Sequence, residues 1–201
     1  MYFSRQRIKM LKQMIQDGKY QAYEVKLNIG CIKEESLSDF IDTMFVAWRR
    51  IVSSRSRGYI RNFDGILRRL FIEYNAMTGL YTPYFHLICV KKKQFVAESE
   101  KYKTQLDEEI LRISTYIKWL SAWVTALKFC AEAPVDFSIL DIECLEKTLS
   151  VFCTNEKYSV RAILDEARKE ILKRACGTHR LVSFHGIFSE KYMNRHVSVE
   201  R

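Results

Sequence analysis

The sequence predicts one α+β domain, residues 1–201, in which helices cover a mostly antiparallel sheet. Segments that alternate apolar and polar residues, as half-buried strands do, lie between segments whose apolar residues recur at helical spacing. The composition is that of a folded protein, with 48% hydrophobic and 13% aromatic residues but only seven glycines and two prolines. The chain of 201 residues is long enough to bury a core, and no change in composition marks a second domain.

The first part of the chain predicts a helix, a strand and a second helix. Residues 4–17 place three aliphatic side chains on one stripe and end at Asp17-Gly18, which predicts a short amphipathic helix. Residues 23–29 alternate strictly between apolar and polar side chains and predict a half-exposed strand. Residues 36–51 open with a capping pair and continue with apolar residues at helical spacing, so we expect a second helix there.

Two shorter segments follow the polar stretch at residues 53–58. Tyr59–Phe63 is expected to form a strand, because aromatic and β-branched residues dominate it. Leu70–Tyr74 is expected to be a further strand or the end of a helix, and the residues alone leave both alternatives open.

The run from Gly79 to Lys91 has the length and composition of a buried strand, and it contains a histidine. The pair Thr78-Gly79 is a turn signal at its start. Because side chains alternate along a strand, one face is expected to carry Tyr84, His86 and Ile88, and the other Phe85, Leu87 and Cys89. Two ligands at positions i and i+2 of such a strand can hold one metal ion from the same face.

A long helix is expected at about residues 96–129. Its apolar residues recur in alternating steps of four and three, as in a heptad repeat: Leu106, Ile110, Ile113, Ile117, Leu120, Val124 and Leu127. Such a stripe can pack on the sheet or on another helix, which we favour, or it can form a coiled-coil dimer with a second copy.

The last part of the chain predicts two helices between two short strands. Phe137–Ile142 is a strand candidate, and a helix is expected to begin at Leu145–Cys153 and to continue to or near Tyr158. Ala162–Arg174 is expected to be helical up to a stop at Cys176-Gly177. A short final strand is expected within Arg180–Phe188.

The positive charge of the chain is concentrated. The formal net charge is +9, and between Trp48 and Leu70 a single acid, Asp64, accompanies the arginines Arg49, Arg50, Arg55, Arg57, Arg61, Arg68 and Arg69. A phosphate backbone is a natural partner for such a surface through counterion release, although a solvated basic face without a partner would look the same. No apolar run approaches the roughly 20 residues that span a bilayer, and no leader opens the sequence, so we expect a cytoplasmic protein without membrane contact.

The histidine strand resembles that of the HUH endonucleases, and most closely that of the replication initiators of rolling-circle plasmids. The family segment commonly reads Tyr-His-Pro-His-Phe-His, and this chain reads Tyr81-Thr82-Pro83-Tyr84-Phe85-His86. The resemblance implies that His86 is a metal ligand and that Tyr84 stands where the family has the other metal-binding histidine.

The acid of the family's metal site has two candidate positions in this chain. The segment Gly58-Tyr-Ile-Arg-Asn-Phe-Asp64 is similar to the family's Gly-x-x-Arg-x-Leu-Glu, which makes Asp64 the implied ligand. The family continues directly into Val-Thr-Tyr-Asn, whereas Tyr74-Asn75 comes later here. Either residues 65–70 are an insertion, or Phe71 occupies the acid position and the ligand is lost.

A further segment, Asn155-Glu-Lys-Tyr-Ser-Val-Arg161, resembles the family's Lys-Tyr-Ser/Thr-x-Lys, which makes Tyr158 the implied nucleophile. The family often has a glutamate four residues before this tyrosine, where this chain has Thr154. Residues 178–188 resemble the closing pattern that implies a role for Arg180, and the likeness covers about residues 22–190.

The resemblance implies an initiator that binds single-stranded or hairpin origin DNA and nicks it through a phosphotyrosine, with magnesium or manganese where the site is intact. With Tyr84 and Thr154 departing from the pattern, we expect a nickase centre that is weakened or lost. An active nickase and a helical dimerisation protein without DNA binding are the alternatives. The residues expected to contact DNA are Arg55, Arg57, Arg61, Lys91, Lys92, Lys93, Lys157, Arg161 and Arg180.

Overall fold

The computed structural model describes residues 5–53, 63–93, 104–128, 135–140, 142–152 and 166–189. Its sheet has the strand order β4-β1-β3-β2-β5, and every neighbouring pair is antiparallel. The strands are β1 (Tyr20–Asn28), β2 (Gly65–Asn75), β3 (Leu80–Lys92), β4 (Val135–Leu140) and β5 (Val182–Gly186). The helices are α1 (Arg5–Gln16), α2 (Leu37–Ser53), α4 (Thr104–Leu127), α5 (Ile142–Phe152) and α6 (Glu166–Cys176), with a 3-10 turn η1 (Glu34–Ser36). The α+β prediction is confirmed.

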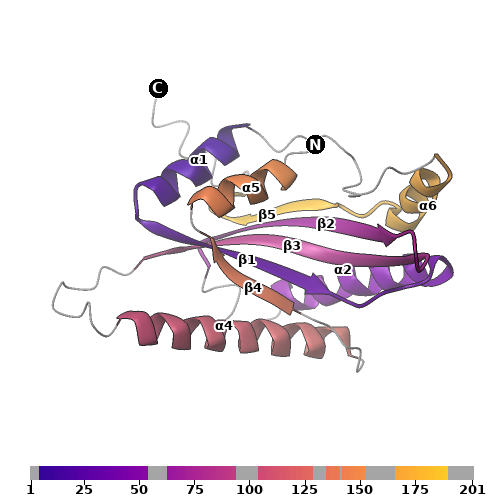
Figure 1. The fold of residues 1–201 in the computed structure, drawn as a ribbon, viewed down its shortest axis with the longest axis horizontal. Coiled ribbons are helices and arrows are strands. Elements are labelled where there is room, and N and C mark those ends of the chain that lie inside the picture. The colour runs from indigo at the N-terminus through magenta and orange to yellow at the C-terminus, as the bar shows by residue number, and fades with distance from the viewer. Residues whose placement is uncertain are drawn as a thin grey trace.

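The helices lie on both faces of the sheet, with α1 and α5 on one side and α2 and α4 on the other (Figure 1). Each face has its own apolar core. One core joins α2, α4 and α6 to the sheet, and the other joins α1 and α5 to the opposite face. We call these the α2 face and the α5 face.

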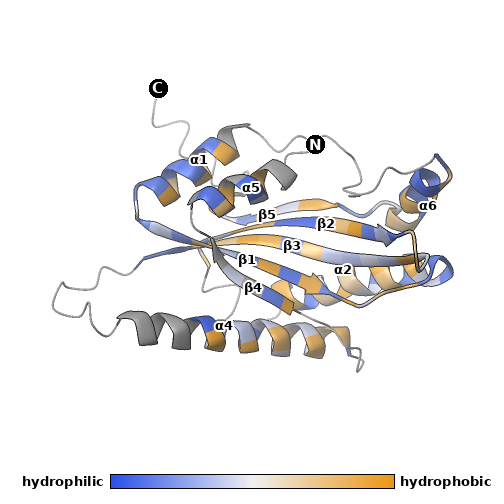
Figure 2. Ribbon diagram, in the orientation of Figure 1, coloured by the Kyte–Doolittle hydropathy of each residue, from blue (hydrophilic) through white to orange (hydrophobic). Residues whose placement is uncertain are grey.

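The hairpin of β2 and β3 is the centre of the fold. A tight turn joins the strands, in which the Gly79 amide donates a hydrogen bond of 2.8 Å to the Asn75 carbonyl. Gly79 has a φ of +69°, which suits glycine. Both strands are buried over most of their length, and hydrophobic residues colour much of β3 (Figure 2). The expected turn at Thr78-Gly79 and the strand that contains His86 are confirmed.

The two faces of β3 carry the side chains that the alternation predicts. Tyr84 and Ile88 belong to the core of the α5 face, whereas Phe85, Leu87 and Cys89 belong to that of the α2 face. His86 lies on the same face as Tyr84, with the two ring centroids 6.4 Å apart.

The long helix α4 packs on the α2 face through two tryptophans outside its heptad stripe and through the end of the stripe, where Leu127 is buried and Leu120 and Val124 are partly buried. Trp119 and Trp123 are fully buried, and Trp123 donates a hydrogen bond of 2.6 Å to the Asn28 carbonyl. In contrast, Ile113 and Ile117 in the stripe are 48% and 55% exposed. The expectation that the helix packs within the fold is confirmed, but the described part of the stripe is buried only toward its end, and Trp119 and Trp123 supply the largest buried side chains of the helix.

Several boundaries differ from the sequence predictions. Leu70–Tyr74 lies inside the longer strand β2, so the alternative of a helix end is wrong. Ile142 begins α5 rather than ending β4. Of the strand expected at Tyr59–Phe63, residues 59–62 lie outside the described residues, and Phe63 precedes β2. Among the described helices, none is long and apolar enough to cross a membrane.

Candidate functional site

His86 occupies the middle of β3, the central strand of the sheet, and is 5% exposed. Its neighbours across the two ladders are Lys26 on β1 and Arg69 on β2. Cross-strand partners share a face, so two cationic side chains flank the histidine on the α5 face. Arg69 is also buried, and its guanidinium carbon lies 5.2 Å from the centroid of the Phe71 ring.

The Glu24 carboxylate supplies a negative charge next to His86 and Lys26. One of its oxygens lies 2.5 Å from the Nε2 atom of His86 and 3.8 Å from the Nζ atom of Lys26, and the other accepts a hydrogen bond of 3.3 Å from Ser138. The contact with His86 lowers the pKa of Glu24 most, and partial burial opposes that shift. The imidazole of His86 is therefore engaged by a carboxylate in the same sheet.

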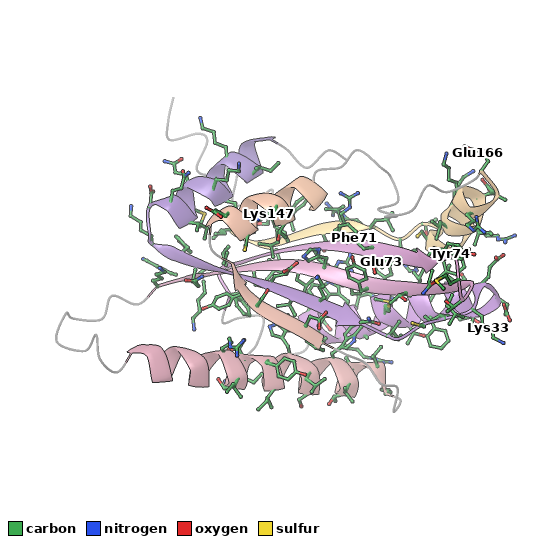
Figure 3. The ribbon with its side chains drawn as sticks, in the orientation of Figure 1. Lys33, Phe71, Glu73, Tyr74, Lys147 and Glu166 are labelled. Carbon is green, nitrogen blue, oxygen red and sulfur yellow. The ribbon has the colours of Figure 1, made fainter. Side chains whose placement is uncertain are left out.

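An aromatic pair lies next to His86. Phe71 on β2 is directly opposite Tyr84 on β3, and their rings stack with centroids 5.6 Å apart and an interplanar angle of 13°. The Phe71 ring is also 5.4 Å from the His86 ring. The Tyr84 hydroxyl donates a hydrogen bond of 3.0 Å to Glu73, which lies two residues beyond Phe71 on β2 (Figure 3).

The structure does not bring Asp64 and His86 together. Asp64 precedes β2, and its carboxylate accepts a hydrogen bond of 2.7 Å from the Lys92 amide at the end of β3. Because His86 is opposite Arg69, five residues along the strand from Asp64, the separation is about 16 Å at the strand rise of 3.3 Å per residue. The expectation that Asp64 and His86 hold one ion is therefore corrected.

Phe71, the other candidate for the acid position that the resemblance implies, lies on β2 in the same strand as Tyr74-Asn75. The position of the family's acid then falls beside Tyr84 and His86.

The side chains at this site are a poor fit for a divalent ion. Phe71 has no donor atom, Tyr84 presents a phenol that is bonded to Glu73, and His86 contacts Glu24. Within the part of the chain that the structure describes, no group of three or more histidine, cysteine, aspartate or glutamate side chains is placed to hold a metal ion. Neutral phenols and phenyl rings do not replace the oxygen and nitrogen ligands that magnesium and manganese require.

The other residues expected at the site fall into separate places. Lys91, Lys92 and Lys93 lie at the end of β3, where the Lys93 amide donates a hydrogen bond to the Lys19 carbonyl. Arg180 is exposed and precedes β5 at the other edge of the sheet. Tyr158, the nucleophile that the resemblance implies, lies outside the described residues, as do Thr154, Arg55, Arg57, Arg61, Lys157 and Arg161.

Two groups of functional interest were not found from the sequence. Glu24 was assigned only to the polar side of a strand, and its contact with His86 depends on the register between β1 and β3. On the α2 face, Arg68 is 3% exposed and lies among aromatic rings near His185. In the sequence, only the high arginine content of this region pointed to Arg68 as a residue of interest. We found no match for this chain among protein-family models, known proteins or solved structures.

Proposed function

We propose that this chain is a cytoplasmic protein of the rolling-circle replication initiator type, which binds plasmid origin DNA and has lost its tyrosine nickase centre. The observation that carries the proposal is the register of β2 and β3. Two sequence segments that each resemble a family motif are neighbours in the sheet, and Phe71, at the acid position, is directly opposite Tyr84, at a histidine position. Two positions implied to ligate one ion would have to be neighbours in this way.

The loss of nicking follows from the chemistry of these replacements. In the implied reaction a metal ion polarises the scissile phosphate and offsets the charge that develops when a tyrosine hydroxyl attacks it. Phe71 and Tyr84 stack on one another and supply no anionic or imidazole ligand. His86 alone remains of the implied ligands, and it is already engaged by Glu24.

Binding of DNA is supported by the distribution of charge. The net charge is +9, and Lys19, Lys91, Lys92 and Lys93 gather at one end of the sheet. Lys19, Lys92 and Lys93 are exposed there. Release of counterions from DNA by such lysines would make the affinity fall steeply with salt.

Fluorescence anisotropy with a labelled hairpin oligonucleotide tests this proposal. We expect binding at 50 mM potassium chloride that weakens steadily toward 200 mM. The double variant Lys92→Gln/Lys93→Gln should reduce the slope of log affinity against log salt by about 1.4 if the lost contacts are with the single-stranded loop, at about 0.7 each, and by about 1.8 if they are with the double-stranded stem, at about 0.9 each.

The matched control removes the same charge elsewhere. Lys169→Gln/Lys173→Gln changes two lysines on α6 that pair with glutamates three residues away, and it should leave the slope unchanged. Absence of binding at low salt, or equal slopes for both double variants, would contradict the proposed DNA-binding surface.

A further inference from the structure

β4 is an outermost strand of the sheet. It pairs with β1 on one side, and along its other edge no strand lies beside it among the described residues. Every second residue of an antiparallel edge strand directs its backbone N–H and C=O groups away from the sheet. Over the six residues of β4, these groups form a short row of donors and acceptors with which an added strand can pair.

A pocket lies next to this strand, between α4 and the start of β4. It has a volume of about 400 Å³ and is lined by residues of both elements: Arg112, Ile113, Tyr116, Val135 and Asp136. Val135 is buried, whereas Ile113 and Tyr116 are 48% and 37% exposed. Figure 1 shows α4 running alongside β4 on this side of the sheet. A largely apolar pocket therefore adjoins an edge strand.

The charged residues of the pocket indicate which kind of side chain it accepts. Asp136 is exposed, and its carboxylate forms no ion pair within the described part of the chain. An inserted lysine or arginine would meet the like charge of Arg112, and an inserted aspartate or glutamate would meet that of Asp136. A tyrosine fits the pocket better, because its ring can pack on Ile113 and Tyr116 while its hydroxyl donates a hydrogen bond to a carboxylate.

The size of this surface favours a peptide over a second copy of the chain. The six residues of β4 extend over about 20 Å at the strand rise of about 3.3 Å per residue. The surface from the strand edge across α4 is about 20 Å wide, which is about 10 Å between the layers and about 10 Å for the helix. Its area is then on the order of 400 Å², about half of the 800 Å² that each partner buries in a standard interface between folded proteins.

We propose that the edge of β4 and the adjoining pocket, together called the β4 site, bind an extended peptide segment of another protein. The segment adds a strand to β4 and inserts a tyrosine side chain between α4 and β4. Backbone hydrogen bonds along β4 supply affinity, and the pocket supplies specificity, as in other cases of strand addition. The β4 site goes beyond the proposed function, because it contains none of the lysines assigned to DNA and does not involve His86.

Peptide selection followed by NMR tests the β4 site. A phage-displayed library of nine-residue peptides, randomised around a fixed central tyrosine, is selected on the immobilised full chain. A selected peptide is then synthesised and titrated into the isotope-labelled protein. We expect saturable shifts of the amide signals in β4 and around the pocket residues of α4, and slower hydrogen exchange of the β4 amides. Replacement of the peptide's tyrosine with alanine should weaken binding at least tenfold.

Matched variants locate the bound peptide. Ile113→Ser should weaken peptide binding at least tenfold, whereas Met77→Ser, which changes a 97% exposed apolar residue at the turn between β2 and β3, should leave it unchanged. Both side chains are exposed, so both variants are expected to fold, and their circular dichroism spectra check this. Failure to select any peptide, shifts that lie outside the β4 site, or equal affinity for the parent and Ile113→Ser would overturn the proposal. Protected β4 amides in the chain alone, together with sedimentation as a dimer, would show that a second copy occupies the edge and would also overturn it.

Discussion

Placing the metal ligands that the resemblance implies next to His86 tests whether Phe71 and Tyr84 occupy ligand positions. The double variant Phe71→Glu/Tyr84→His places a carboxylate and an imidazole at the two positions that face each other next to His86. We expect this variant to bind manganese one-to-one, whereas the unaltered chain binds it weakly, because the unaltered site offers a phenol and a phenyl ring instead.

The expected changes in unfolding free energy follow from the burial of the Phe71 and Tyr84 rings. Phe71 is 2% exposed and stacks on Tyr84, so the variant without metal should lose on the order of 3–5 kcal/mol of unfolding free energy. Metal at a hundredfold excess over its dissociation constant should return about 2.7 kcal/mol. For a chain of this size, that corresponds to a rise in melting temperature of about 5–10 °C.

Thermal unfolding with and without manganese chloride, together with calorimetric titration, measures these effects. The control variant Phe71→Gln/Tyr84→His has the same shape but no carboxylate, and it should gain much less stability from manganese. If the folded double variant binds no more manganese than the control, then Phe71 does not occupy the acid position. Tight one-to-one binding by the unaltered chain would refute the loss of the site.

Three further variants test the packing and electrostatics of the fold. The contact with His86 lowers the pKa of Glu24 in the folded state, so Glu24 stabilises the protein above its usual pKa of 4.5, and this contribution is lost as the pH falls through the lowered value. In urea unfolding, Glu24→Gln should therefore be less stable than the parent at pH 7, and a gap of the same size at pH 3 would contradict the ion pair. Gly186→Ala should lose on the order of 1–3 kcal/mol or more, because Gly186 has a φ of +61° and an added Cβ would overlap the Asp64 carbonyl; an unchanged urea midpoint would refute this. Ile117→Ser should change the unfolding free energy by less than about 0.5 kcal/mol, because Ile117 is 55% exposed. Sedimentation of the parent as a dimer that this variant dissociates would favour the alternative of a helical dimerisation protein.

The strand that contains His86 could be predicted because its local signals agree. A turn at Gly79 and a continuous apolar run both describe a central strand, and the two faces of that strand were assigned correctly from the period of two residues alone. By contrast, α4 was expected to pack through a regular aliphatic stripe. Its described contacts combine the end of that stripe with Trp119 and Trp123, and a heptad pattern contains no information about how the tryptophans fit against the sheet.

The composition of the site depends on strand register, which the sequence did not supply. Asp64 and Phe71 were both candidates for the acid position that the resemblance implies, and it is the register, in which β2 begins at Gly65 and Phe71 meets Tyr84, that places Phe71 rather than Asp64 near His86. The contact of Glu24 with His86 has the same origin, because it joins residues far apart in the chain across β1 and β3. Long-range pairing of this kind has no local signal.

The measurement that tests the central claim most directly is a search for a covalent DNA adduct. The protein is incubated with manganese and labelled single-stranded hairpin oligonucleotides, and the products are separated on a denaturing gel, with parallel retention of DNA measured across a salt series. Our account predicts retention that weakens with salt and no adduct. An adduct that disappears in Tyr158→Phe would contradict it, because it would show a working tyrosine nickase despite Phe71 and Tyr84.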